Sequence, residues 1–223
     1  MWPFRKRLLT MEMVKYDHAG WEIYDESSTH RRWYTQERDA VLLSFSIGDP
    51  TINHPYDFTN QTQMAAFYEQ QAQQNQGVML EVAPTTIAGI PGMRGVFKYR
   101  LPNTLALYFV GIVVVAFRDV SFQFNTEAME RGTTGMREAL VGVINPQPMP
   151  ETEPITLSST EEFFTMLHNA PLQRILPDNP EYDDVIPDHP LSKVRRLQRH
   201  LIATTQLDER LRTSPAYRYR PYR

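Results

Sequence analysis

The sequence has no cysteine among its 223 residues. Without thiols the chain forms no disulfide, has no thiolate nucleophile and offers no thiolate ligand to a metal. Proteins that do without disulfides are typical of a reducing compartment, so we expect a cytoplasmic protein. The segment from Met1 to Leu9 contains only two leucines, far short of the apolar core of a secretory signal. We therefore expect no signal peptide.

Long hydrophobic runs and a strong net charge are also missing. The longest apolar stretch, Leu105 to Phe117, covers 13 residues, whereas a membrane-spanning helix needs roughly 20. We therefore expect no membrane partner. A formal net charge of −3 gives no general attraction to nucleic acid, so a nucleic-acid partner is not expected and any electrostatic partner must be recognised by a local patch.

The composition that is present is that of a globular domain. Hydrophobic residues make up 41% of the chain and charged residues 22%, enough for one buried core. Short strand-like runs dominate the first 125 residues. Between 60 and 76 the period changes to helical spacing, with Asn60 as the predicted N-cap and Gly77 as the predicted terminator.

The strand pattern resumes after this helix. We expect strands at 78–82, 87–90, 95–101, 105–117 and 120–125, separated by proline and glycine at 83–84, 91–92 and 102–103. The segment 105–117 is apolar on both faces, so it should lie centrally under a layer of helix. Arg118 and Asp119 are the predicted tight turn after it.

Helices and prolines follow in the last third of the chain. A helix is predicted over 134–144, with Met136, Ala139, Leu140, Val143 and Ile144 on one face. Four prolines between Asn145 and Pro154 predict an extended linker. Residues 1–144 are thus predicted to form an α+β domain with a short N-terminal arm, and residues 145–223 a proline-rich extension packed on it.

Two short helices are predicted within this extension. Residues 158–162 offer a capping box for a helix that ends near Asn169. A final helix starts near Pro190 and carries Leu191, Val194, Leu197 and Leu201 inward. Between the two lies a proline-rich acidic segment that we expect to be a solvated loop.

The order of elements resembles the Mog1/PsbP-like α+β sandwich over roughly 21–144. Three runs also resemble a family of uncharacterised bacterial proteins: Phe117-Arg118-Asp119, the segment Glu130 to Ala139, and the segment Pro187 to Arg196. The resemblance implies an antiparallel sheet covered by helices. It also implies a binding or accessory module more than an enzyme, an analogy of fold that assigns no site residues.

One motif has the features of an anion site. From Glu130 to Glu138, glycines and threonines lead into a helix whose first turn exposes backbone N–H groups. The candidate ligand-binding residues are Arg118, Arg131, Thr133, Thr134 and Arg137. The alternative is an ordinary helix start capped by Thr133 or Thr134, with Arg131 and Glu138 paired at the surface.

A second region of interest lies at the end of the chain. The last predicted helix exposes cations, and the tail interleaves arginine with tyrosine, which suits an anionic or protein partner. The candidate partner-binding residues are Arg195, Arg196, Arg199, Tyr217, Arg218, Tyr219 and Arg220. The alternative is a tail that folds back over the acidic run of residues 178–188 and covers apolar surface.

Catalytic and metal-binding signatures are not found in the sequence. The six histidines form no HxH, HxxH or HExxH pair, and no serine lies in a GxSxG elbow. We assign no enzyme class and expect no cofactor and no metal. Two hypotheses remain: a non-enzymatic module that acts on a protein partner or forms a homodimer, and a protein that binds a small anion, or an enzyme, using the Glu130–Glu138 turn.

Overall fold

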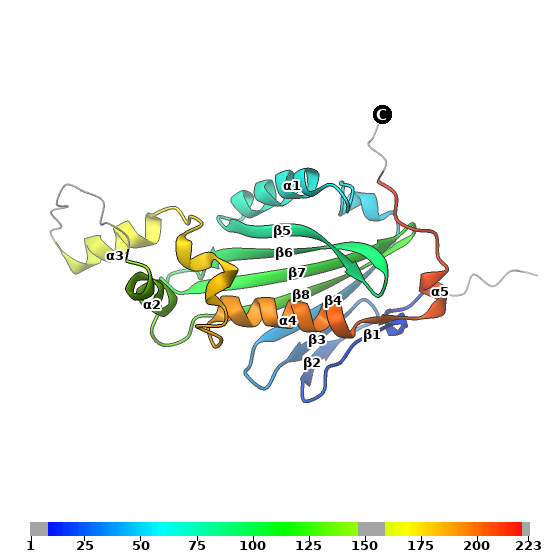
Figure 1. Cartoon of the computed structure of the whole chain (residues 1–223), viewed down its shortest axis with the longest axis horizontal. Helices are drawn as coiled ribbons and strands as arrows, with labels where there is room; N and C mark the ends of the chain where they lie inside the picture. Colours follow the sequence, from blue (N-terminus) through cyan, green and yellow to red (C-terminus); the bar gives the residue numbers. More distant parts are fainter. Residues whose placement is uncertain (1–8, 147–158, 220–223) are drawn as a thin grey trace, which may run out of the picture.

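A seven-stranded antiparallel sheet forms the centre of the molecule (Figure 1). The computed structural model describes residues 9–146 and 159–219. Its strands are β2 (Glu22–Glu26), β3 (His30–Tyr34), β4 (Ala40–Ile47), β5 (Val78–Ile87), β6 (Ile90–Arg100), β7 (Leu107–Phe117) and β8 (Val120–Met129), in the spatial order β2-β3-β4-β8-β7-β6-β5. A short pair, β1 (Val14–Lys15) and β9 (Gln206–Leu207), lies outside this sheet. The predicted α+β class is confirmed.

Helices cover both faces of the sheet. The helices are α1 (Gln61–Gln74), α2 (Met136–Ile144), α3 (Thr160–Asn169), α4 (Pro190–Thr204) and α5 (Glu209–Arg212). Single 3-10 turns are η1 (Met11–Met13), η2 (Pro50–Ile52), η3 (Leu176–Asp178) and η4 (Pro180–Tyr182). Of these, α1 packs on one face next to β5, and α4 packs on the other face across β7 and β8. The sheet is therefore the middle layer of a sandwich.

Strand β7 is buried on both sides, as the sequence predicts. Ile112, Val114 and Ala116 pack with Met64 and other residues under α1. Val113, Val115 and Phe117 of the same strand lie in the opposite core with Leu201 of α4. Because successive side chains of a strand point to opposite faces, an apolar run without alternation serves both layers.

Helix α4 supplies the second layer although it follows the proline-rich segment. Leu191, Val194 and Leu201 are completely buried against the sheet, and Pro190 is its first residue, as predicted. His189 caps it by accepting the Leu191 N–H. Most of the predicted linker lies outside the described residues. Within them, α4 is part of the same packed structure as the sheet.

Two sequence-based boundaries are wrong. Strand β5 continues through Pro84, and β6 begins before Gly92, so the predicted breaks there do not occur. Proline is tolerated on an edge strand, and β5 is an edge. The chain instead turns at Ala88 and Gly89, both with positive φ.

Asn60 caps α1 as predicted, but the left-handed residue after this helix is Gln76, not Gly77.

The two ends of the sheet differ in their neighbours. At one, called the hairpin end, the β7–β8 turn at Arg118–Asp119 lies beside the C-terminal segment, where Ala216 bridges Phe117. At the other, called the cleft end, the loop between β6 and β7 meets α2 and α3, which lie together at the left of Figure 1.

Candidate functional site at the cleft end

Helix α2 turns its predicted apolar face outward, although the apolar face of a surface helix ordinarily packs on the core. Of the residues on that face, Met136, Leu140, Val143 and Ile144 are 49, 41, 81 and 56% exposed. The buried residues of α2 are Arg137 and Val141. The helix therefore presents most of its apolar surface outward.

The burial of Arg137 explains this orientation. The Arg137 side chain is 1% exposed and pairs with Asp183 at 2.9 Å. It also donates to the Ser192 hydroxyl at 2.7 Å, to the Asn179 carbonyl at 3.0 Å and to the Pro177 carbonyl. A planar guanidinium with several acceptors in its plane is well suited to burial. Since these donors are occupied, Arg137 holds α2 in place and has little left to offer an anion.

Arg195 of α4 was expected on an exposed, partner-binding face, and this is wrong. Its side chain is 4% exposed and pairs with Asp183 at 3.1 Å and with Glu81 at 3.0 Å. Its Nη2 donates to the Asp178 carbonyl at 2.8 Å. The apolar positions of α4 indicated the inward face correctly but gave no sign that a cation lies beside them.

Lys98 and Asp178 complete a buried charge cluster. Their side chains are each 2% exposed, with Nζ and Oδ2 2.6 Å apart. The cluster comprises Glu81, Lys98, Arg137, Asp178, Asp183 and Arg195, three cations and three carboxylates. Its half-buried member, Glu81, also pairs with the more exposed Arg94 at 3.4 Å. The acidic segment is therefore not simply a solvated loop, because two of its carboxylates are in the core.

The turn before α2 already holds an anion, the carboxylate of Glu130. This carboxylate accepts the Leu107 N–H at 2.8 Å and the Gly135 N–H at 3.2 Å. Gly135, with φ of 74°, is the N-cap of α2, and no side chain caps the helix. Thr133 and Thr134 are both exposed. The predicted alternative of a threonine cap is therefore wrong.

The ionisation of Glu130 is favoured by these contacts. Burial alone would raise its pKa. The neighbouring His189 imidazole, whose Nε2 lies 3.7 Å from Oε1, and the N–H groups of Leu107 and Gly135 outweigh burial and lower the pKa below the ordinary value of 4.5. At neutral pH the turn is therefore occupied by its own carboxylate.

The predicted ligand-binding residues are not gathered at one point. Arg118 pairs with Asp119 at the hairpin end, the far end of β8 from Glu130. Arg131 is exposed and donates to the Arg38 carbonyl at 3.1 Å. With Arg137 buried and Thr133 and Thr134 at the surface, the structure does not assemble an anion site from this set.

The predicted partner-binding residues are also spread over different regions. On α4, Arg196 and Arg199 are exposed, and Arg196 lies 3.4 Å from a Glu37 oxygen. In the tail, Arg218 is exposed and Tyr219 is half-buried. Arg220 lies outside the described residues. These side chains form a dispersed basic surface and not a single patch.

The tail does not cover the acidic run of residues 178–188, the segment named in the alternative prediction. Tyr217 packs on Phe58 with ring centroids 4.8 Å apart, and its hydroxyl donates to the carbonyls of Tyr56, at 3.0 Å, and His54. The tail therefore lies over residues 54–58 at the hairpin end. The idea that it neutralises the acidic run is wrong for the described residues.

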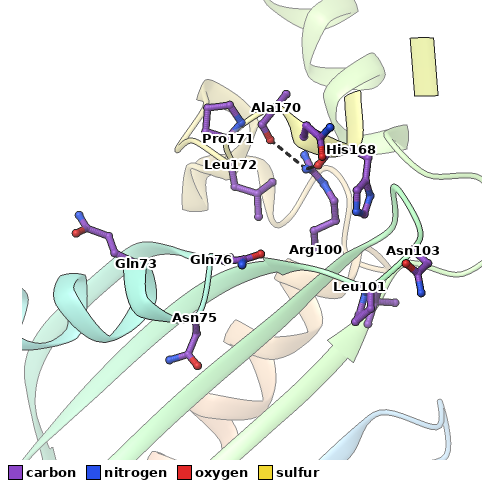
Figure 2. Close-up of a pocket in the computed structure, with 13 residues that line it drawn as sticks. Gln73, Asn75, Gln76, Arg100, Leu101, Asn103, His168, Ala170, Pro171 and Leu172 are labelled. Carbon is purple, nitrogen blue, oxygen red and sulfur yellow. Dashed lines mark hydrogen bonds between the residues drawn. The ribbon is translucent and has the colours of Figure 1, made fainter. Parts of the chain in front are cut away.

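Three adjoining cavities open at the cleft end, with volumes of about 740, 670 and 350 Å³. The first lies between the C-terminal ends of α1 and α3 (Figure 2). His168 and Asn103 line the first and second, Arg100 and Leu172 the first and third, and Thr134 the second and third. We call the three together the cleft.

Arg100 connects the cleft to α3. Its Nη1 donates to the carbonyls of Ala170, at 3.0 Å, and His168, and Figure 2 shows it directed at this end of the helix. His168 lies 3.3 Å from the Thr104 carbonyl through Nδ1. These contacts fix the C-terminal end of α3 over the loop between β6 and β7.

Sequence reasoning did not single out Arg100, His168 or Lys98. They come from segments far apart in the chain, and no local motif joins them. One signal was present. Lys98 lies in a strand whose neighbouring residues Val96, Phe97 and Tyr99 are apolar or aromatic and are buried or half-buried. A lysine at an inward position indicates a buried partner.

Among residues 9–146 and 159–219, no group of three His, Asp or Glu side chains is placed to hold a metal.

Comparisons with known proteins add little beyond the fold. No protein-family model matches the sequence, and no curated protein matches it. One similar structure is a protein from Bacteroides thetaiotaomicron VPI-5482, 10% identical with a TM-score of 0.34; the match covers 56% of this chain and 41%, less than half, of that protein. Another is the cyanobacterial PsbP (CyanoP) of Synechocystis sp. PCC 6803, also 10% identical with a TM-score of 0.34, covering 59% of this chain and 86% of that one.

A TM-score of 0.34 and 10% identity are too low to transfer a function from either protein. No described helix has the length and apolarity needed to cross a membrane.

Proposed function

We propose that the protein is a non-enzymatic, cytoplasmic binding module that works through protein–protein contacts and docks through the outer face of α2. The observation that supports this is the orientation of α2, which buries an arginine and exposes its apolar stripe. A helix that only stabilised its own chain would bury that stripe. Its exposure therefore favours a surface that another protein covers.

Among the described residues, the arrangement most similar to a catalytic triad is that of Ser27, His30 and Asp25, which lies at the end of the sheet opposite to α2. Ser27 Oγ is 2.8 Å from His30 Nδ1, and His30 Nε2 is 2.8 Å from Asp25 Oδ2. Ser27 Oγ also accepts the N–H groups of Thr29 and His30, each at 3.2 Å. None of these residues lines the cleft. We interpret the contacts as stabilising the turn between β2 and β3, which leaves binding as the better-supported function.

The outer face of α2 carries no charge. Met136, Leu140, Val143 and Ile144 follow one another at helical spacing, with the small residues Ala139 and Gly142 between them. A side chain added at Gly142 would meet nothing within 4 Å. An opposing backbone can therefore approach the helix closely at this point.

These properties favour a second copy of this chain as the occupant. An isologous interface opposes each residue to a symmetry-related surface, so a charged face would repel itself whereas an uncharged one does not. Each Leu, Ile, Val or Met side chain contributes roughly 1.5–3 kcal/mol when fully buried. Four partly exposed side chains from each copy exceed the lower part of the association cost of roughly 4–15 kcal/mol by a few kcal/mol, so we expect a weak dimer.

Sedimentation velocity over a dilution series tests this proposal. The unmodified chain should pass from dimer to monomer on dilution, and the Leu140→Asp/Val143→Asp variant should be monomeric at every concentration. High salt should leave the dimer intact, because the contact is apolar. A monomer at all concentrations would remove the second copy as the occupant.

The matched control is Ile52→Asp. Ile52 is 71% exposed and lies in η2, away from α2. This variant has the same chemical change at a similar exposure and should associate like the unmodified chain. Loss of the dimer in both variants would mean that added negative charge, and not the α2 face, controls association. Thermal melts of all three proteins, measured at a dilution where each is monomeric, should agree because the changed side chains are exposed.

A further inference from the structure

The cleft is bounded on two sides by side chains that have no partner within the described chain. Gln73, Gln76, Asn103 and Asn169 line its first cavity, and no described residue accepts from or donates to their carboxamides. Figure 2 labels Gln73, Gln76 and Asn103, with Gln76 between α1 and the segment that follows α3. Each carboxamide has both donors and an acceptor. The first cavity thus offers several hydrogen-bonding groups of both kinds.

Charge does not dominate this cavity. Among the described residues no carboxylate lines it, and the one guanidinium, Arg100, already donates through Nη1 to carbonyls at the end of α3. An anionic ligand would therefore meet only a partly satisfied cation, and a cationic ligand would find no counter-charge. The lining suits a neutral ligand with alternating donors and acceptors.

The third cavity adds one unsatisfied donor and one unsatisfied acceptor. Arg100 Nε and Glu138 Oε2 are both buried and have no hydrogen-bond partner among the described residues. Both residues line this cavity. Because neither atom reaches the cavity surface, Arg100 Nε can donate to a ligand C=O, and Glu138 Oε2 can accept a ligand N–H, only once the side chain turns toward the cavity. Main-chain peptide groups carry these two functions side by side.

The two flanking cavities also provide apolar walls. Leu105 and Phe164 line the second, while Leu105, Leu107 and Leu172 line the third. Side chains of an extended peptide alternate to opposite sides of its backbone, about 3.3 Å per residue along the chain. Amides along the middle with apolar hollows beside them match that alternation.

From these observations we propose that the cleft binds an extended, uncharged peptide segment, recognised mainly through its main chain. The carboxamides of Gln76 and Asn103 bond to its N–H and C=O groups, and the hollows at Leu105 and Leu172 accept apolar side chains. This site is separate from the outer face of α2. The two proposals therefore stand or fall independently.

Fluorescence anisotropy with a labelled, end-capped heptapeptide of alternating leucine and serine tests the site on the full chain. The same peptide N-methylated at alternate residues keeps its side chains but lacks half of its main-chain donors. We expect the first peptide to bind and the second to bind at least tenfold more weakly. Equal binding of both would overturn main-chain recognition, and binding of neither would overturn the site.

Variants locate the binding. Gln76→Gly and Asn103→Gly remove exposed carboxamides at two positions of positive φ, 55° and 59°, which glycine adopts readily, so folding should be unaffected. Each should weaken peptide binding about fivefold, the equivalent of one net hydrogen bond. Gln70→Ala, an exposed amide of α1 that does not line the cleft, is the control and should bind normally. Unchanged peptide binding when Gln76 and Asn103 are both replaced would overturn the proposal. Saturable binding of maltose in place of the peptide would also overturn it. The Leu140→Asp/Val143→Asp variant should bind the peptide normally, which separates this result from the dimer.

Discussion

The hairpin end and the cleft end of the sheet are closed by different chemistry. At the hairpin end, Phe58, Tyr56 and Tyr68 pack together and Tyr217 of the tail lies across them. At the cleft end, charged side chains occupy the interior and apolar side chains of α2 face outward. The hairpin end thus buries apolar side chains like an ordinary core, whereas the cleft end buries charged side chains and exposes apolar ones.

This difference indicates where a function can be placed. At the hairpin end, Tyr56 and Phe58 are buried by their own packing, and the exposed Ile47 and Ile52 lie on separate elements. At the cleft end, the ion pairs fix α2 and the acidic segment in position without using apolar area, which leaves that area for another molecule. Buried charge at this end is therefore associated with an exposed binding surface, and variants that exchange the two kinds of chemistry test the association.

The largest effect is expected from Arg137→Ala. Removing this cation leaves Asp183 buried without one of its two guanidinium partners, and breaking a buried pair costs roughly 3–5 kcal/mol. The free energy of unfolding from urea titration should fall by about this amount, and α2 should lose protection in hydrogen exchange before the hairpin end does.

Arg196→Ala is the matched control for that change. Arg196 is an exposed arginine of α4 whose contact with Glu37 is at the surface, so its loss should cost less than about 1 kcal/mol. Equal destabilisation by the two variants would show that the buried cluster has no special part in holding the cleft end.

A second test asks whether the cleft end needs charge at all. Lys98→Met alone leaves Asp178 buried without its lysine and should cost a few kcal/mol, about as much as other single breaks of buried pairs. The double change Lys98→Met/Asp178→Leu removes both charges and should restore most of that loss. Asp178 Oδ2 also accepts the Ile175 N–H, so a small deficit should remain. A double variant as unstable as the single one would contradict this reasoning; urea titration of both measures it.

The hairpin end should respond to acid at a higher pH than the cleft end. His54 is 4% exposed, and burial lowers its pKa to about 4 from an ordinary value of 6.5. The unfolded chain therefore binds this proton more readily, so the contribution of His54 to stability is complete above pH 6.5 and is lost as the pH falls to about 4. At ~1.4 kcal/mol per pKa unit, the loss amounts to roughly 3 kcal/mol.

Two variants separate this response from that of the cleft end. His54→Phe should flatten the fall in unfolding free energy between pH 6.5 and 4, measured by urea titration at each pH. Glu130→Gln should lower the unfolding free energy by about the same amount at every pH above 4.5 and so leave the slope in that range unchanged; the difference from the unmodified chain should shrink only in more acid solution, because the Glu130 pKa lies below 4.5. If both variants showed the same slope of unfolding free energy against pH, the acid responses of the two ends would not have separate origins.

The sequence predicted the apolar layers better than the charged ones. The two-sided run of β7, the Asn60 cap and the start of α4 at Pro190 follow from local patterns, because periodicity and capping chemistry act over a few residues. The inversion of α2 was not predicted, since it depends on acceptors at Pro177, Asn179 and Asp183 that lie about 40 residues further along the chain. A hydrophobic stripe indicates the inward face only when no buried ion pair competes for it.

The smallest expected effect concerns the tail at the hairpin end. Tyr217→Phe keeps the ring on Phe58 but removes the hydroxyl that donates to the carbonyls of His54 and Tyr56, which should cost about 1 kcal/mol. Tyr217→Ala also removes the ring contact and should cost more and raise proteolytic cleavage of the tail. Neither change should alter peptide binding or dimerisation, because both proposed surfaces lie at the other end of the sheet. If Tyr217→Phe instead weakened either interaction, the two ends would be coupled, and the division of the molecule into a packed end and a binding end would have to be abandoned.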